Sequence, residues 1–440
     1  MKVLILAGGK GTRLGKMTES IPKPLIPING KPVIEYQIEL LQKNNLHNIT
    51  ILINHLGEKI KEYFGDGKKW GINIDYLEES FPLGTAGGIK EMEKQFNEDF
   101  LVLYGDLLIN VDLKRIIKQH KQNKLQNKNC IGTLMVHPNN HPYDSDLVEI
   151  DEQMKILNFL SKPHSENLIY KNIVNAAVYV LSPSICEYIP KGVTSDFGKD
   201  IFPLIIKNKK HSIYAYNSPE YLKDIGTPER LLQANTEVKN GTYHKSVLST
   251  KKPAIFLDRD GVINEEVDQL CRIEDFKLIE NADKAIKKIN ESGFYAIVIT
   301  NQPMIAKGFC TYDDVIEINK KMETELGKVG AKLDAIYLCP HHPEQGFAGE
   351  NKKFKIKCSC RKPDIRMITA AATDLNIDLE NSFFIGDSTT DALTAKNAGI
   401  RFIGVKTGYG CADKKFAKQV DILPDELKLD IYQAIKSLLI

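Results

Sequence analysis

Short runs of apolar residues that end in glycine, aspartate or asparagine constrain the fold of this chain more than any other feature. They do not alternate with polar residues, and segments with helical spacing, such as Pro32 to Leu41, lie between them. Such runs are typical of parallel strands that are buried on both faces. The sequence therefore predicts an α/β fold with strands near residues 3–6, 49–53, 100–104, 254–257, 296–299 and 383–385.

The strand pattern starts again at Ala254, which predicts a second domain. A chain of 440 residues also exceeds what one hydrophobic core usually holds. The polar stretch 237–253 contains Asn240-Gly241 and ends in Pro253, and we interpret it as a linker. The sequence thus predicts domains over residues 1–236 and 254–440.

Charge and hydropathy exclude several classes of partner. The net charge is +2 and there is no basic block, which argues against a nucleic-acid surface. No apolar stretch reaches the roughly 20 residues that span a bilayer. Met1-Lys2 leads straight into the first strand, without the features of a signal peptide. We expect a cytoplasmic enzyme without nucleic-acid or membrane partners, and a homo-oligomeric state is left open.

A glycine-rich loop follows the first predicted strand. It reads Gly8-Gly9-Lys10-Gly11-Thr12-Arg13, and Pro22-Lys23-Pro24 comes shortly after it. Glycines at the end of a buried strand let the backbone approach a ligand, and their N–H groups can cradle phosphate. The guanidinium of Arg13 adds donors that suit phosphate oxygens. For the glycine loop alone, a tight strand-to-helix turn is the alternative.

The order of these and later motifs resembles the sugar-1-phosphate nucleotidyltransferase family. The resemblance covers residues 1–235 and includes Leu83 to Gly88, Gly105-Asp106, Lys162-Pro163, Asn175 and Asp224-x-Gly226-Thr227-Pro228. It implies a Rossmann-like domain with a mixed, mainly parallel sheet. It also implies an enzyme that joins a nucleoside triphosphate to a sugar 1-phosphate and releases pyrophosphate.

The resemblance assigns roles around the phosphates. Arg13 would hold the β- and γ-phosphates, Lys23 the α-phosphate, and Asp106 and Asp224 a Mg²⁺ ion. Because one anion must attack another, cations that screen and align them are the chemistry this reaction needs. The nucleotide would also contact Leu6, Ala7, Gly8, Gly9, Gly11, Thr12, Gly84 and Thr85.

The sugar side follows from the same resemblance. Lys162 would bind the sugar phosphate and Asn175 a sugar hydroxyl. Lys16 and Ser161 depart from the family pattern beside the substrate. The polar loop 137–146 is a candidate for part of the sugar pocket, with an ordinary surface loop as the alternative.

In the second half of the chain, a predicted strand ends in Asp258-Arg259-Asp260-Gly261. Two carboxylates at this spacing can divide phosphate hydrolysis, one attacking phosphorus and the other moving the proton. A surface turn also favours Asp-x-Asp-Gly. Three further elements follow in order. Thr300-Asn301 and Gly386-Asp387, the latter with Asp391, each end a predicted strand, and Arg361-Lys362 between them supplies cations.

This series is similar to the haloacid dehalogenase superfamily of phosphatases, which implies a second Rossmann-like domain. Asp258 would be the nucleophile and Asp260 the general acid and base. Mg²⁺ would be held by Asp258, Asp387 and the backbone carbonyl of Asp260. The substrate and its phosphate would contact Thr300, Asn301, Arg361 and Lys362.

A cysteine and histidine cluster narrows the choice within the superfamily. Cys339-Pro340-His341-His342 and Cys358-Ser359-Cys360 offer three thiolates and an imidazole, the ligand set of a closed structural Zn²⁺ site. By resemblance to the histidinol-phosphate and heptose-bisphosphate phosphatase group, His341 is preferred to His342. The loop between His342 and Cys358 is long for this group, and Pro303-Met304 replaces its common Ser-Gly.

The two halves together point to nucleotide-heptose synthesis. Removing the 7-phosphate of a heptose 1,7-bisphosphate leaves a heptose 1-phosphate, the kind of acceptor that the first domain would use. The resemblance implies GTP and the α-anomer as substrates. The alternatives are another sugar or nucleotide (a hexose 1-phosphate, UTP or dTTP), or one half that acts only as a nucleotide-sugar sensor.

Overall fold

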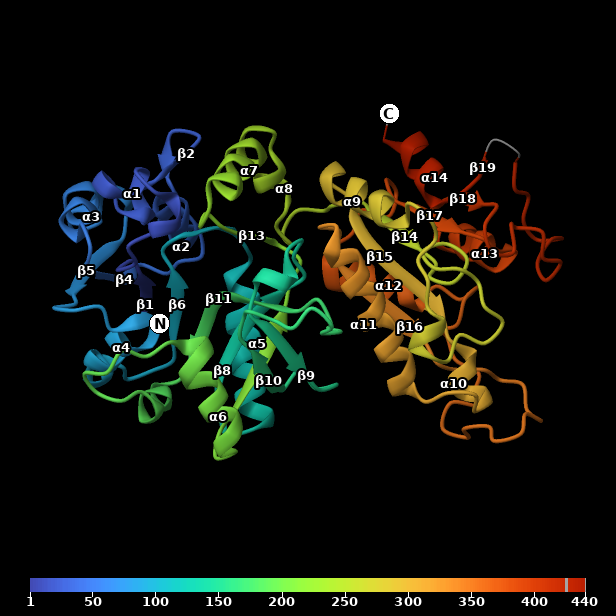
Figure 1. Cartoon of the computed structure of the whole chain (residues 1–440), viewed down its shortest axis with the longest axis horizontal. Coiled ribbons are helices and arrows are strands. Elements are labelled where there is room, and N and C mark those ends of the chain that lie inside the picture. The colour runs from blue at the N-terminus through green and yellow to red at the C-terminus, as the bar shows by residue number, and fades with distance from the viewer. Residues whose placement is uncertain (424–425, 440) are drawn as a thin grey trace. The chain divides into compact units, whose positions relative to one another are not determined.

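The computed structural model describes residues 1–423 and 426–439 and divides into two compact units (Figure 1). The first unit comprises Met1–His137, Ser145–Pro163 and Ile173–Leu248. The second comprises Pro138–Asp144, His164–Asn172 and the chain from Ser249 onward. Residue 440, where the second predicted domain ends, lies outside the described residues. Each unit is α/β, as the sequence predicts.

A mixed sheet, parallel at its centre, forms the first unit. Its main path runs β10-β9-β11-β6-β1-β4-β5, and β8 joins β11 to β12. Strand β1 pairs in parallel with β4 and β6, whereas β11 is antiparallel to β6. The strands are β1 (Val3–Leu6), β4 (Asn48–Ile53), β5 (Asn73–Glu78), β6 (Phe100–Tyr104), β8 (Cys130–His137), β9 (Leu147–Ile150), β10 (Ile156–Leu160), β11 (Val174–Leu181) and β12 (Ser212–Asn217).

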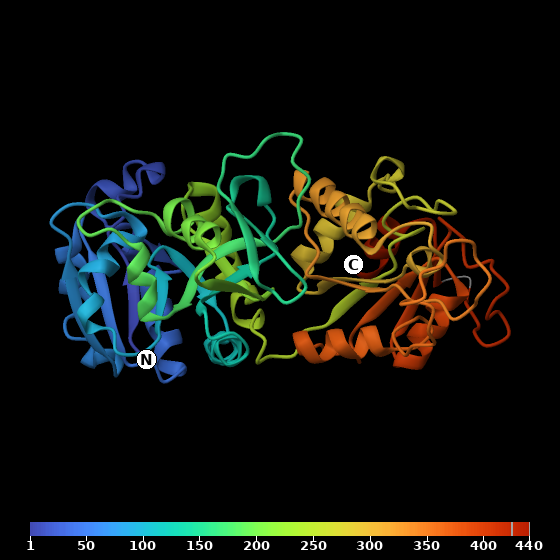
Figure 2. The ribbon, with the colours of Figure 1, turned by 90° about the horizontal axis from the view of Figure 1, so that it is seen from below.

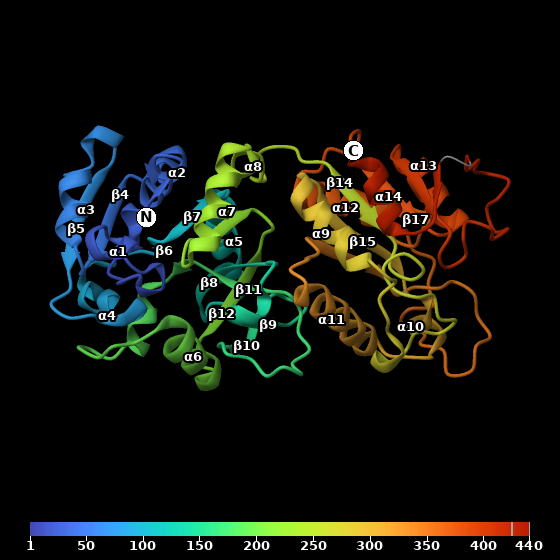
Figure 3. The ribbon, with the colours of Figure 1, turned by 45° about the horizontal axis from the view of Figure 1, so that its top comes forward.

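Both faces of this sheet are buried, which explains why its central strands do not alternate in polarity. Val3 and Ile5 pack against one helical layer and Leu4 against the other. The first layer contains α2 (Val33–Lys43), α3 (Gly57–Phe64) and α5 (Leu113–Gln126); the second contains α4 (Gly84–Glu91) and α6 (Phe202–Asn208). Figure 3 shows α2 and α3 on one side of the sheet and α4 and α6 on the other.

A parallel sheet of six strands forms the second unit, in the order β16-β15-β14-β17-β18-β19. Helices α9, α11 and α14 share one core with its strands, and α12 lies on the opposite face (Figure 2). The elements are β14 (Ala254–Leu257), β15 (Tyr295–Asn301), β16 (Ala335–Cys339), β17 (Phe383–Gly386), β18 (Arg401–Val405), β19 (Leu427–Lys428), α9 (Ala282–Ser292), α10 (Pro303–Lys307), α11 (Tyr312–Lys328), α12 (Arg366–Leu375), α13 (Thr389–Ala398) and α14 (Ile431–Leu438).

The strand order places the predicted site residues. The chain starts each sheet in the middle, at β1 and at β14, and adds strands on both sides. Open α/β sheets bind ligands outside the carboxyl ends of the strands at this point, where the order reverses. Gly8 follows β1 and Asp106 follows β6, whereas Asp258 follows β14 and Asp387 follows β17.

The segment predicted as a linker is partly folded. It holds the end of α7 (Pro228–Lys239) and all of α8 (Thr242–Lys245). Tyr243 is buried, with its ring centroid 5.3 Å from that of Tyr36, and its hydroxyl donates to Ile109 O at 3.0 Å. One aromatic anchor within a polar stretch therefore keeps the first unit compact up to Leu248.

Two short segments from the N-terminal half of the sequence belong to the second unit. The Tyr170 N–H donates to Thr324 Oγ1 of α11 at 3.0 Å. Gly327 faces Pro142 and the Tyr170 hydroxyl, so closely that a side chain there would collide with both. Loop 137–146 is thus divided between the units. No helix within the described ranges has both the length and the apolar character that crossing a bilayer requires.

Candidate active sites

A cavity of about 390 Å³ opens at the carboxyl ends of β1 and β6. Every residue that the sequence predicts to contact the nucleotide lines it: Leu6, Ala7, Gly8, Gly9, Gly11, Thr12, Gly84 and Thr85. Arg13, Lys23 and Asp106 line it as well. The structure therefore brings the glycine loop, the proline-flanked lysine and the first predicted metal ligand to one place.

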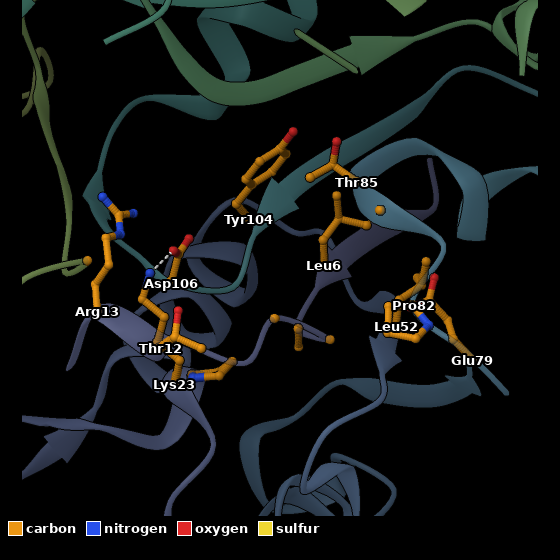
Figure 4. A pocket seen from close by; sticks show the side chains of 17 residues that line it. Leu6, Thr12, Arg13, Lys23, Leu52, Glu79, Pro82, Thr85, Tyr104 and Asp106 are labelled. Atoms are coloured by element: carbon orange, nitrogen blue, oxygen red, sulfur yellow. Dashed lines mark hydrogen bonds and ion pairs between the residues drawn. The ribbon is translucent and has the colours of Figure 1, made fainter. Parts of the chain in front are cut away.

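The cationic end of this cavity is formed by Arg13 and Lys23 (Figure 4). Lys23 is buried, and its ammonium forms an ion pair with the Asp106 carboxylate. Gly11 has φ +66°, and a Cβ at this position would lie 2.9 Å from Thr18 Cγ2 and 3.2 Å from Lys23 Cβ. Glycine is required here because it alone adopts this conformation easily and leaves room for Lys23.

Asp224 lies next to Asp106, although the two are far apart in sequence. Strand β13 (Tyr221–Asp224) pairs with β7 (Leu107–Asn110), with Asp224 opposite Leu107, and the Ile225 N–H donates to Asp106 O at 3.2 Å. The Asp224 carboxylate accepts from Arg230 Nη1 at 2.7 Å. Carboxylate oxygens are the donors that Mg²⁺ prefers, so this pair fits the predicted ion.

The opposite end of the cavity contains a carboxylate that the sequence motifs did not identify. Glu79 follows β5 and lines the cavity beside Leu52 and Pro82. Figure 4 shows these three residues at one end and Arg13, Lys23 and Asp106 at the other. Burial raises the pKa of Glu79 to about 7.

Lys162 and Asn175, the predicted sugar contacts, meet at Asp146. The Lys162 N–H donates to Asp146 Oδ1 at 3.2 Å, and the Asn175 N–H donates to Asp146 O at 2.9 Å. The Asn175 side chain donates to the Tyr179 hydroxyl at 2.9 Å. Neither Lys162 nor Asn175 is among the residues that line the 390 Å³ cavity. Asp146 is the last residue of the candidate loop 137–146.

In the second unit, a buried lysine links two carboxylates. Lys362 Nζ lies 2.7 Å from Asp258 Oδ2 and 2.6 Å from Asp391 Oδ1. The Ser388 hydroxyl donates to Asp391 Oδ2 at 2.6 Å, which fixes Asp391 against the lysine. Burial and the charge of Asp391 raise the pKa of Asp258, and Lys362 opposes that rise.

Asp258, Asp387 and Asp391 have carboxylate oxygens within 4.8 Å of one another. Burial raises the pKa of Asp387, and the neighbouring charges of Asp391 and Asp258 add to the effect. Three crowded carboxylates beside one lysine form a site with excess negative charge, which a divalent cation would relieve. The residues present therefore fit the predicted Mg²⁺.

Asp260 is held by three donors that the motif alone does not reveal. The Arg259 guanidinium donates to it at 3.0 Å, Asn264 Nδ2 at 2.9 Å and Gln302 Nε2 at 2.8 Å. Burial opposes ionisation of Asp260, but the charge of Arg259 and these hydrogen bonds outweigh it and lower the pKa. Arg259 is itself fully buried and also donates to Asn319 at 3.1 Å.

The remaining predicted contacts occupy the same end of the sheet. Thr300 is buried, and its hydroxyl accepts from Gln302 Nε2 at 2.9 Å. The Asn301 side chain accepts from Lys362 N at 3.0 Å and donates to Lys362 O at 3.2 Å, so it positions the lysine. Glu266 was not singled out in the sequence, and burial with the charges of Asp260 and Asp258 raises its pKa to about 8.

Cys339, His341, Cys358 and Cys360 form one cluster, with ligand atoms within 4.8 Å of one another. Cys339 Sγ lies 3.6 Å from Cys358 Sγ, and His341 Nδ1 lies 3.3 Å from Cys360 Sγ. Four such donors converging on one point fit tetrahedral Zn²⁺. Arg361 Nη1 donates to His341 O at 3.2 Å, which ties the cluster to the cation beside Lys362.

In the comparison with known proteins, the N-terminal and C-terminal parts of the chain match different families. The Nucleotidyl transferase family model matches residues 2–241, which is more than half of the chain, and a HAD-hydrolase-like model matches residues 359–428. A UTP–glucose-1-phosphate uridylyltransferase of Synechocystis sp. is 36% identical over 259 residues, which cover 54% of this chain and 65% of that protein.

Two further relatives match different parts of the chain. A mannose-1-phosphate guanylyltransferase of Mycobacterium tuberculosis is 29% identical over 239 residues, covering 54% of this chain and 64% of that protein. The chain thus spans less than two thirds of either nucleotidyltransferase relative. A D-glycero-beta-D-manno-heptose-1,7-bisphosphate 7-phosphatase of Haemophilus ducreyi is 37% identical over 183 residues, covering 39% of this chain and 97% of that protein. The chain therefore belongs to the nucleotidyl transferase family over residues 2–241, and its C-terminal part belongs to the HAD-like heptose-1,7-bisphosphate 7-phosphatases.

Proposed function

We propose that this chain catalyses two steps of nucleotide-heptose synthesis. The second unit removes the 7-phosphate of D-glycero-α-D-manno-heptose 1,7-bisphosphate. The first unit transfers GMP from GTP to the resulting heptose 1-phosphate, giving GDP-D-glycero-α-D-manno-heptose and pyrophosphate. The observation that supports this most is the presence, in one chain, of a nucleotidyltransferase cavity and a heptose-bisphosphatase relative.

The geometry of the first unit suits nucleotidyl transfer. An oxygen of the sugar phosphate attacks the α-phosphorus, the bond to the bridging oxygen breaks, and pyrophosphate leaves. Lys23 and Arg13 lie where they can neutralise the phosphates, and no protein nucleophile is needed. Mg²⁺ bound by Asp106 and Asp224 would add charge neutralisation at the same end.

The second unit suits hydrolysis through a covalent intermediate. The Asp258 carboxylate attacks the phosphorus of the 7-phosphate, and the bond to the C7 oxygen breaks as that oxygen takes a proton from Asp260. Asp260 must bind this proton before the step, because Arg259 favours its ionised form in the free protein. Asp260 then removes a proton from water, which attacks the phosphorus of the aspartyl-phosphate. The bond to the Asp258 oxygen breaks, which releases inorganic phosphate and restores Asp258. Lys362 neutralises the phosphoryl oxygens, and Asn301 keeps it in place. Mg²⁺ at Asp258 and Asp387 would add Lewis-acid stabilisation.

A bisphosphate substrate also needs cations away from the reacting phosphate. Arg361 directly precedes Lys362 in the sequence. Burial and, after it, the charges of Arg361 and Lys307 lower the pKa of Lys415, whereas the charges of Glu344 and Asp413 oppose that effect. A group of cations that includes the neighbour of the catalytic lysine suits a second phosphate group.

Substrate profiling with separate readouts tests this proposal. Phosphate release is followed with the α- and β-heptose bisphosphates and with hexose bisphosphates, and pyrophosphate release with each triphosphate and sugar 1-phosphate. We expect phosphate release from the α-heptose bisphosphate to be fastest and to fall about 1,000-fold or more in Asp258→Asn. Pyrophosphate release from GTP and heptose 1-phosphate should be unchanged in that variant.

A second assignment keeps both reactions but changes the substrates. The relative with the higher identity is named as a UTP enzyme, and the phosphatase relative is named for the β-anomer. Fastest turnover of UTP, of a hexose 1-phosphate or of the β-bisphosphate would therefore replace the proposed substrates and leave the reaction types intact. If one half of the chain shows no activity with any of these substrates, a sensor role for that half is favoured instead.

A further inference from the structure

The 390 Å³ cavity has two chemically different ends. Arg13 and Lys23 occupy one end, so the triphosphate of a nucleotide must lie there. A nucleotide extends away from its phosphates, and the base must then reach the end formed by Leu52, Pro82 and Glu79 (Figure 4). Leu52 and Pro82 are apolar and suit the faces of a base, whereas Glu79 is the charged group at this end.

Glu79 is kept in place by hydrogen bonds to the end of β4 and by two neighbouring glycines. Its N–H donates to Ile53 O at 3.0 Å, and its carbonyl accepts from Asn54 Nδ2 at 2.7 Å. A Cβ on Gly8 would come within 3.2 Å of the carboxylate, and one on Gly88 would collide with it. The two glycines therefore leave the space that the Glu79 carboxylate fills. The Leu83 N–H donates to this carboxylate, and no charged group among the described residues contributes to its pKa shift.

An ionised carboxylate has two oxygens that only accept hydrogen bonds, so it selects a base with two adjacent donors. Guanine presents N1–H and the N2 amino group side by side on its Watson–Crick edge. Uracil and thymine present one N–H between two carbonyl oxygens, and adenine and cytosine place an acceptor beside their amino group. Guanine alone matches both oxygens of a carboxylate.

We propose that Glu79 determines the base specificity of the transferase by accepting hydrogen bonds from N1–H and N2–H of guanine. This inference rests on the proposed nucleotidyl transfer and deepens it, because it assigns a residue to the choice of GTP. It also explains how GTP can be preferred although a relative of higher identity is named as a UTP enzyme.

Three nucleotides and one isosteric variant test the assignment. Inosine triphosphate keeps N1–H but lacks the N2 amino group, so the wild type should use it about 10- to 100-fold less efficiently than GTP, measured as kcat/KM by pyrophosphate release. Glu79→Gln replaces one acceptor by a donor, and its amide matches the N–H and carbonyl of uracil. This variant should lose most of the difference between GTP and inosine triphosphate and should gain UTP use relative to GTP.

The neighbouring Glu78→Gln is the matched control, because Glu78 is exposed and its carboxylate pairs with Lys61 instead of lining the cavity. It should keep the wild-type ranking of nucleotides. A wild-type thermal unfolding profile, followed by circular dichroism, checks that the first unit of each variant is folded. If the wild type uses GTP and Glu79→Gln leaves the ranking unchanged, this inference is wrong while the proposed function stands. If no triphosphate reacts with any sugar 1-phosphate, the proposed function itself fails.

Discussion

At the residue level, the ionisation of Glu79 has a measurable consequence. Burial raises the pKa of this carboxyl to about 7, and the hydrogen bond from the Leu83 N–H only partly offsets that effect. Below this pH the protonated carboxyl offers one donor and one acceptor, which match uracil; above it, the carboxylate offers two acceptors, which match guanine. We predict that the ratio of kcat/KM for GTP to kcat/KM for UTP rises about tenfold between about pH 6 and pH 8.

Taking a ratio removes ionisations that both nucleotides share, such as those of the triphosphate and of the lysines beside it. Glu79→Gln does not titrate in this range, so its ratio should stay flat across the same buffers. If the wild-type ratio of kcat/KM for GTP to that for UTP stays constant or falls as the pH rises, the ionised carboxylate does not select the base.

Single residues also mark the limit of prediction from the sequence. Asp258 and Lys23 were identified because each stands in a motif with fixed spacing. Arg259 lies within the Asp258 to Gly261 motif, but its hydrogen bonds to Asp260 were not predicted. Glu79 and Gln302 were not singled out either, and their roles follow from contacts made where separate strands end. For these two residues, tertiary proximity supplies what the local sequence does not indicate.

Among the structural elements, the loop between β16 and α12 gives the next prediction. Its cysteines and His341 converge, and Arg361-Lys362 follows Cys360 directly, so metal binding should order the cations of the phosphatase site. We expect the purified protein to contain one Zn²⁺ per chain by elemental analysis. Cys358→Ser should lose the metal and lower kcat/KM for phosphate release at least about tenfold.

Two histidine variants control for this prediction. His341→Gln should also lose zinc, whereas His342→Gln should keep it, because His342 lies outside the cluster. Pyrophosphate release should stay at the wild-type rate in all three variants, since the transferase cavity is lined by residues of the first unit. Zinc retained in His341→Gln but lost in His342→Gln would reverse the assignment.

The elements themselves were largely predictable, and the exceptions have physical reasons. All six predicted strand segments lie in strands, because a run buried on both faces has a plain sequence signature. The predicted linker holds α8 because Tyr243 anchors a polar stretch. Segments 138–144 and 164–172 belong to the second unit through contacts such as Tyr170 with Thr324, which no local pattern encodes. The domain boundaries therefore stay a prediction.

For the whole molecule, the nucleotide cavity and the phosphatase carboxylates lie in different units. The residues that line the transferase cavity all belong to the first unit, and Asp258, Lys362 and Asp387 all belong to the second. Two sites of this kind can work in sequence if the intermediate passes through solvent. We predict that an equal mixture of Asp258→Asn and Lys23→Met makes the nucleotide sugar from the bisphosphate at about half the wild-type rate per total protein.

Half the rate is expected because each variant supplies the active site that the other lacks. The mixture therefore contains half of the normal number of phosphatase sites and half of the normal number of transferase sites. Neither variant alone should form product, and heptose 1-phosphate should appear first, as a lag before the nucleotide sugar. With the wild type, added unlabelled heptose 1-phosphate should dilute label that enters from the bisphosphate. Product label that resists dilution, together with an inactive mixture of separately active variants, would show instead that the intermediate is handed over within one chain.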